Sequence, residues 1–96
     1  MATILIKHSV ADYAAWREVY DSVDDLRTTH GVTNPRVWRE VGAPGTIFVS
    51  HDFATLDAAR GFAGDPGLGD AMAKAGVVGE PRIEFLEDAG LSLIHI

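Results

Sequence analysis

The sequence predicts an α+β domain in which two similar strand–helix–strand halves share one antiparallel sheet. The first observation is an internal repeat, because the segment that begins at His8 matches the segment that begins at His51. The repeat carries four identities at equivalent positions: His8/His51, Ala11/Ala54, Ala15/Ala58 and Arg17/Arg60. The second observation is that each copy follows a β-rich run and opens a helical pattern. The order is therefore βαββαβ, and right-handed crossovers give a four-stranded sheet with both helices on one face.

The first half is expected to contain a strand over Thr3–His8, with Ile4, Ile6 and His8 on one face. A helix should follow from about Val10–His30, with Ser9 as its N-cap. The expected inner stripe of this helix has steps of three and four: Tyr13, Trp16, Tyr20, Val23 and Arg27.

The second half is expected to continue the sheet after the break at Asn34-Pro35. Pro81 should lie at a strand start or on a sheet edge, because proline cannot donate a ladder hydrogen bond. The expected elements are a strand over 36–41, a hairpin loop over 42–45, a strand over 46–52, a helix over 56–62 capped by Thr55, a helical piece over 68–75, and a strand over 81–86.

The size of the chain favours a single domain over residues 1–90 and a homodimer. Ninety-six residues bury only a modest core. Leu5 and Phe48 fall on the sheet face away from the helices, so both faces are apolar and a second subunit would cover the outer one. The tail over 91–96 is either a strand that crosses to a partner or a non-native addition.

Composition excludes several classes of partner and site. The chain has no cysteine, which removes disulfides and thiolate metal sites and fits a reducing cytoplasm, where we expect the protein. A net charge of -6 argues against nucleic acid. No apolar run reaches the ~20 residues of a membrane span, and the first residues lack the features of a signal peptide. We expect no metal and no cofactor.

Several short patterns together resemble the antibiotic biosynthesis monooxygenase-like family of the dimeric α+β barrel superfamily. They are His8-x-Val-x-Asp-Tyr-x-x-Trp16, Phe53-x-x-Leu-Asp-Ala58, Phe62-x-x-Asp-Pro66, Gly76-Val-Val-Gly-x-Pro81 and Phe85-Leu-Glu87. The resemblance covers about residues 2–88. It implies a ferredoxin-like subunit, a dimer whose two sheets form a barrel, and a pocket between sheet and helices.

The resemblance leaves the chemistry open, since the family includes cofactor-free oxygenases of aromatic polyketides, haem-degrading enzymes and proteins without known activity. The haem-degrading branch has a His on the second helix, and residues 56–75 contain none. The cofactor-free oxygenases place Asn, Trp and Arg around the substrate, whereas the only Asn here is Asn34, in a loop. Neither site transfers directly.

His8 is the candidate catalytic residue, because a neutral imidazole facing the helices can act as a general base. The alternative is a structural histidine that forms a hydrogen bond with a helix N-terminus or with the backbone. Trp16 and Tyr20 are candidates for the aromatic wall of a site or for ordinary core. Arg27 and His30 could anchor an anionic group or lie at the wet rim. Two further candidates for substrate binding are Trp38, whose face is undetermined, and His51, which the fold should keep apart from His8.

The function expected from these features is a cofactor-independent monooxygenase-like or cyclase-like enzyme acting on a small aromatic or polyketide-like molecule. The alternatives are a non-catalytic ligand-binding or assembly module and, more weakly, a haem-binding protein. The two halves differ where Trp16 aligns with Ala59 and Tyr20 with Ala63, so the pocket is expected between an aromatic helix and a small-residue helix.

Overall fold

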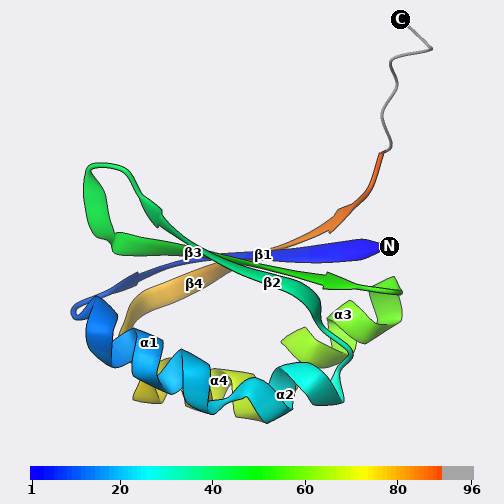
Figure 1. The fold of residues 1–96 in the computed structure, drawn as a ribbon, viewed down its shortest axis with the longest axis horizontal. Helices are drawn as coiled ribbons and strands as arrows, with labels where there is room; N and C mark the ends of the chain where they lie inside the picture. Colours follow the sequence, from blue (N-terminus) through cyan, green and yellow to red (C-terminus); the bar gives the residue numbers. More distant parts are fainter. Residues whose placement is uncertain (90–96) are drawn as a thin grey trace, which may run out of the picture.

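A four-stranded sheet with all the helices against one face makes up the computed structural model, which describes residues 1–89 (Figure 1). The elements are β1 (Ala2–Val10), α1 (Tyr13–Ser22), α2 (Asp24–Thr29), β2 (Thr33–Glu40), β3 (Ala43–Phe53), α3 (Leu56–Ala63), α4 (Pro66–Lys74) and β4 (Val77–Glu87). The sheet is antiparallel with the order β2-β3-β1-β4. The predicted α+β fold is confirmed. The tail over 91–96 lies outside the described residues.

The core follows from the alternation of the two central strands. In β1 every second residue from Ala2 to Val10 is buried, and the inward residues of β3 from Ile47 to Phe53 are buried as well. The strands pair so that His8 is opposite Ile47 and His51 is opposite Ile4. Both histidines therefore occupy inward positions in otherwise apolar rows.

The internal repeat is visible in the caps of α1 and α3. The Asp12 carboxylate accepts a hydrogen bond from the Ala15 backbone N–H at 3.2 Å, and the Thr55 hydroxyl accepts one from the Ala58 N–H at 3.1 Å. The prediction that Ser9 caps the first helix is wrong, because β1 continues to Val10 and Ser9 still pairs within the sheet.

The single helix predicted over 10–30 is also wrong, because the chain breaks into α1 and α2 at Val23. The Ser22 hydroxyl donates to the Val19 carbonyl at 2.7 Å. That carbonyl would otherwise accept the Val23 N–H, which instead bonds the Tyr20 carbonyl at 3.4 Å. Hydrogen bonds from a serine hydroxyl to a carbonyl of the preceding turn bend helices. Asp24 and Asp25 then favour the start of a new helix, because acidic residues stabilise a helix N-terminus.

The second half is more regular than predicted. The loop predicted over 42–45 is wrong, because β3 begins at Ala43 and the turn consists of Val41 and Gly42, the latter with φ 84°. The helical piece predicted from residue 68 begins at Pro66, where a proline fits the first helical turn.

The last strand, β4, is also longer than predicted, since it runs from Val77 to Glu87 and not from 81 to 86. It is an edge strand, as expected for one that contains Pro81. The pairing of β4 with β1 shifts between Lys7 and Ser9, beside His8.

The outer face of the sheet carries exposed aromatic and aliphatic side chains. Trp38 pairs with Phe48, which pairs in turn with Lys7, so all three point away from the helices. Trp38 is 43% exposed and Leu86, on the same face, 44%. Among residues 1–89, none of the helices has the length and apolar character that crossing a membrane requires.

The cap assignments predict a matched pair of stability changes. Asp12→Ala and Thr55→Ala should each lower the free energy of unfolding by about 1 kcal/mol, because each leaves a helix N–H without its acceptor. Ser9→Ala should cost under ~0.5 kcal/mol, as surface changes usually do. Urea denaturation followed by circular dichroism measures all three, and a larger loss in Ser9→Ala than in Asp12→Ala would contradict the assignment.

Candidate ligand-binding cavity

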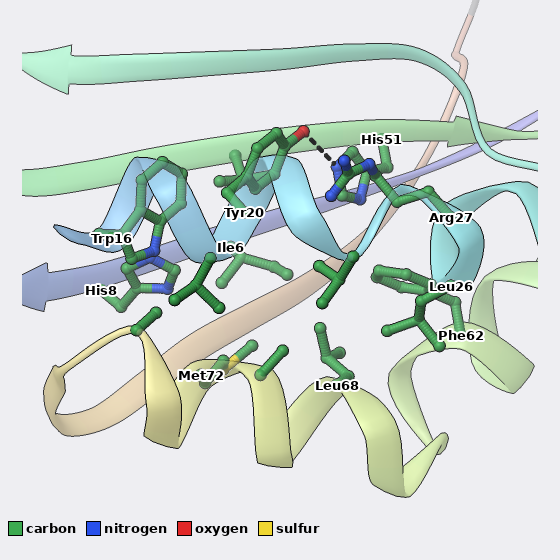
Figure 2. Close-up of a pocket in the computed structure, with 15 residues that line it drawn as sticks. Ile6, His8, Trp16, Tyr20, Leu26, Arg27, His51, Phe62, Leu68 and Met72 are labelled. Carbon is green, nitrogen blue, oxygen red and sulfur yellow. Dashed lines mark hydrogen bonds between the residues drawn. The ribbon is translucent and has the colours of Figure 1, made fainter. Parts of the chain in front are cut away.

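A cavity of about 50 Å³ lies between the helix-facing side of the sheet and the helices (Figure 2). Strands β1 and β3 form its floor, while α1, α2, α3 and α4 form its walls. Its lining is Ile6, His8, Trp16, Val19, Tyr20, Val23, Leu26, Arg27, Val49, His51, Phe62, Leu68, Ala71, Met72 and Ala75. The cavity is therefore mostly apolar, with a few polar groups at defined places.

Three polar or charged residues are buried among residues 1–89, and all three line this cavity. They are His8 at 6% exposed, Arg27 at 7% and His51 at 3%. Burying a polar or charged group is unfavourable unless it is bonded or paired. Their convergence on one cavity of a small core is typical of a ligand site.

His8 lies at one end of the cavity, beside the Trp16 indole at 5.6 Å between ring centres. Both ring nitrogens are buried and neither has a hydrogen-bond partner in the described chain. Burial lowers the pKa of His8 below its usual value, so the ring is neutral at pH 7. A neutral imidazole without a protein partner can accept a proton from a ligand.

His51 lies towards the other end and is hydrogen-bonded to Tyr20, with 3.1 Å between His51 Nε2 and the Tyr20 hydroxyl oxygen (Figure 2). Its Nδ1 is buried without a partner in the described chain. Burial, helped by the positive charge of Arg27, lowers the pKa of His51 to about 4. Burial also raises the pKa of Tyr20. Both groups are therefore uncharged at pH 7.

Arg27 reaches this end from α2, and its guanidinium lies 4.0 Å from the centre of the Tyr20 ring. A cation over an aromatic face is attracted by the ring quadrupole. Among the described residues it has one ion pair, from Nη2 to the Asp24 carboxylate, which is 3.4 Å long, and the Asp24 side chain is 75% exposed. The positive charge is thus inside the protein while its partner is mostly in solvent.

Aromatic rings link the two ends of the cavity. Trp16 stacks on Tyr20 with ring centres 5.0 Å apart, and Tyr20 lies 6.2 Å from His51. His51 in turn meets Phe62 edge to face at 5.3 Å. A flat ligand in this cavity would lie along aromatic surface between His8 and His51.

The structure places five of the candidate site residues in the cavity and two elsewhere. His8, Trp16, Tyr20, Arg27 and His51 line it. His30 lies outside the lining and pairs with Asp65, the N-cap of α4, at 2.7 Å. Trp38 lies on the outer face of the sheet.

The two histidines do not meet within the subunit, as predicted. His51 follows the partner of His8 by four residues along β3, so the backbone positions of the two histidines are about 13 Å apart along the strand direction at ~3.3 Å per residue. They nevertheless line the same cavity, one towards each end.

The wall of small residues is not where the repeat suggested. Ala59 and Ala63 of α3 lie outside the lining, and the small side chains in the cavity are Ala71 and Ala75 of α4. The helix over 68–75 was predicted, but its place in the cavity wall was not, although a helical spacing marks its cavity face, which consists of Leu68, Ala71, Met72 and Ala75.

The cavity is small for an aromatic ligand. An engineered cavity of roughly 150 Å³ admits benzene, so a ring enters here only if the wall moves. Met72, with its flexible side chain, and the glycine-containing helix α4 are the adaptable parts of that wall. The cavity as it stands is too small for haem. Among residues 1–89, no group of three or more His, Cys, Asp or Glu side chains is placed to hold a metal ion.

Comparison with known proteins identifies the fold. No protein-family model matches the chain, and no curated protein matches it. Solved structures do. A proposed antibiotic biosynthesis monooxygenase from Deinococcus radiodurans superposes with a TM-score of 0.74 at 18% identity, covering 95% of each chain. A second such protein, from Caulobacter crescentus, gives 0.74 at 20% identity over 93% of this chain and 90% of that one.

SnoaB, a cofactor-independent oxygenase from Streptomyces nogalater, gives a TM-score of 0.76 at 14% identity, covering 94% of each chain. The chain has the fold of the antibiotic biosynthesis monooxygenases. The predicted resemblance is confirmed at the level of the fold, since identities below 25% do not carry activity from one protein to another.

The low pKa of His51 predicts a loss of stability on acidification. Between pH 6.5 and 5 the unfolded chain gains a proton on His51 that the folded chain does not accept, so the free energy of unfolding falls as the pH falls. The expected loss from this residue is about 2 kcal/mol, to which His8 adds in the same direction. Urea denaturation at several pH values measures it. His51→Asn should flatten the dependence, and an unchanged slope in that variant would contradict the account.

Proposed function

We propose that the chain is a subunit of a homodimeric, cofactor-independent enzyme of the monooxygenase-like type, which acts on a small aromatic molecule in this cavity. The observation that carries the proposal is His8, a buried imidazole that lies at the end of an aromatic cavity and has no hydrogen-bond partner among residues 1–89. The shared fold with SnoaB, a cofactor-independent oxygenase, supports it.

The proposed chemistry begins with proton removal. His8 takes a proton from an acidic C–H or O–H group of the ligand. The apolar walls of the cavity keep water away from the resulting anion. In an oxygenase the resulting carbanion reacts with dioxygen, and the balanced conversion of a methylene group is R₂CH₂ + O₂ → R₂C=O + H₂O. A cyclase or isomerase would use the same base without consuming dioxygen, so oxygen uptake separates the two.

Replacement of His8 tests the proposed base. With anthrone as the probe, whose methylene group is acidic, the wild type should consume one O₂ for each anthraquinone formed. His8→Gln should lower the rate at least 100-fold, since a positioned general base contributes ~10²–10⁴. The matched control is His30→Gln, which removes a histidine outside the cavity and should retain the rate within twofold. Equal rates for wild type and His8→Gln would remove His8 as the base.

The proposed dimer is supported by the outer face of the sheet. Trp38 and Leu86 are exposed there, and two cations lie over its aromatic rings: Lys7 at 5.5 Å from the Phe48 ring and Arg36 at 4.0 Å from the Trp38 ring. Exposed apolar side chains gathered on one face are typical of an interface.

Trp38→Glu should weaken the dimer at least tenfold, because it places a carboxylate in the apolar contact. Sedimentation velocity at several protein concentrations measures the effect. The matched control is Ala14→Glu, which places the same carboxylate at an exposed position of α1 in the helical layer and should leave the dimer intact. A wild type that is monomeric at micromolar concentration would contradict the dimer.

A further inference from the structure

We infer that Arg27, together with the one hydrogen-bond donor that the Tyr20–His51 pair leaves free, binds a carboxylate of the ligand at the end of the cavity away from His8. The inference rests on the proposed function in one respect, namely that the cavity holds an aromatic molecule. It adds the class of that molecule: a flat aromatic acid whose carboxylate and reactive hydrogen are at opposite ends.

The first support is the poorly compensated charge of Arg27. This side chain is buried, yet its one ion pair within residues 1–89 is 3.4 Å long and goes to the mostly exposed Asp24. Charge-assisted hydrogen bonds are usually ~2.7–2.9 Å. Buried charges in proteins are normally paired, so this end of the cavity favours the arrival of an anion.

The second support is the set of polar groups around that charge. The Tyr20 ring lies under the guanidinium at 4.0 Å, and its hydroxyl is hydrogen-bonded to His51, whose Nδ1 has no partner in the described chain. The acidic neighbour of His51 in the chain, Asp52, lies on the outer face of the sheet. There it accepts hydrogen bonds from Thr3 at 2.7 Å and Asn34 at 3.2 Å. No carboxylate among the lining residues competes for this site.

The form of the guanidinium favours a carboxylate over a neutral polar group. Its N–H groups form a planar fork that matches two carboxylate oxygens, and stacking on an aromatic ring leaves the edges of the fork available. A neutral amide presents one acceptor and no charge.

The spacing of the two ends sets the length of the ligand. Because His8 and His51 are about 13 Å apart along the sheet, a single ring does not reach from one to the other. A fused ring system, or a ring with an extended acid chain, reaches both, with Trp16 and Tyr20 along its flat side.

Binding of two isosteric probes tests the inference without any need for turnover. 2-Naphthoate and 2-naphthamide have nearly the same shape, but only the first is an anion at pH 7. Calorimetry should show the wild type binding naphthoate at least tenfold more tightly. Arg27→Met should abolish this preference by weakening naphthoate and leaving naphthamide unchanged. Arg17→Met is the matched control, because Arg17 also lies over the Tyr20 ring, at 5.4 Å, but is 44% exposed and outside the cavity lining.

The outcomes are distinct. Equal binding of the two probes to the wild type, no binding of naphthoate, or a preference that survives Arg27→Met would overturn the inference. If Arg27→Met does not fold, Arg27→Lys decides, since it keeps the charge and removes the fork and should reduce the preference without abolishing it. His8→Gln should retain the full preference. A failure of the proposed catalysis would therefore leave this result standing, and the reverse also holds.

Discussion

The alternation of side chains along β1 and β3 is the constraint on which the cavity depends. Every second residue of these central strands faces the helices. A histidine at position 8 or 51 is therefore buried, even though burying an imidazole costs desolvation energy. Packing of α1, α2 and α4 over those positions then closes the walls. The two histidines of the site are thus held by the central strands, while the wall formed by α4 contains glycines and a methionine.

The two ends of the cavity differ in their electrostatics although both carry a buried histidine. At the His8 end, burial alone lowers the pKa of the imidazole, and neither nitrogen is hydrogen-bonded within the part of the chain that the structure describes. At the His51 end, a fixed positive charge and a tyrosine hydroxyl are added. The cavity has a proton acceptor at one end and a positive charge at the other. A ligand with an acidic hydrogen and a distant carboxylate would therefore bind in one orientation.

Much of the fold could be predicted because the internal repeat agrees with the apolar periodicity of about 2 in the strands and about 3.6 in the helices. The same repeat could also have located the cap of α1, since Thr55 aligns with Asp12. The break at Val23 was missed because a serine hydroxyl that bonds backbone leaves no mark in the apolar pattern. The face of Trp38 was undetermined because β2 has charged or polar residues on both sides. The helical spacing of α4 indicates that one of its faces is buried, but which helix lines the cavity with small side chains depends on tertiary packing.

The central claim is that the buried polar residues form a ligand site and are not merely structural. Nitrogen-15 NMR of the histidine rings during a titration with 2-naphthoate tests it most directly, because the side chains report separately. The account predicts that the ring nitrogens of His8 and His51 shift with saturation, while those of His30, which lies outside the cavity and pairs with Asp65, do not. Shifts confined to His30, or none at any histidine, would contradict it.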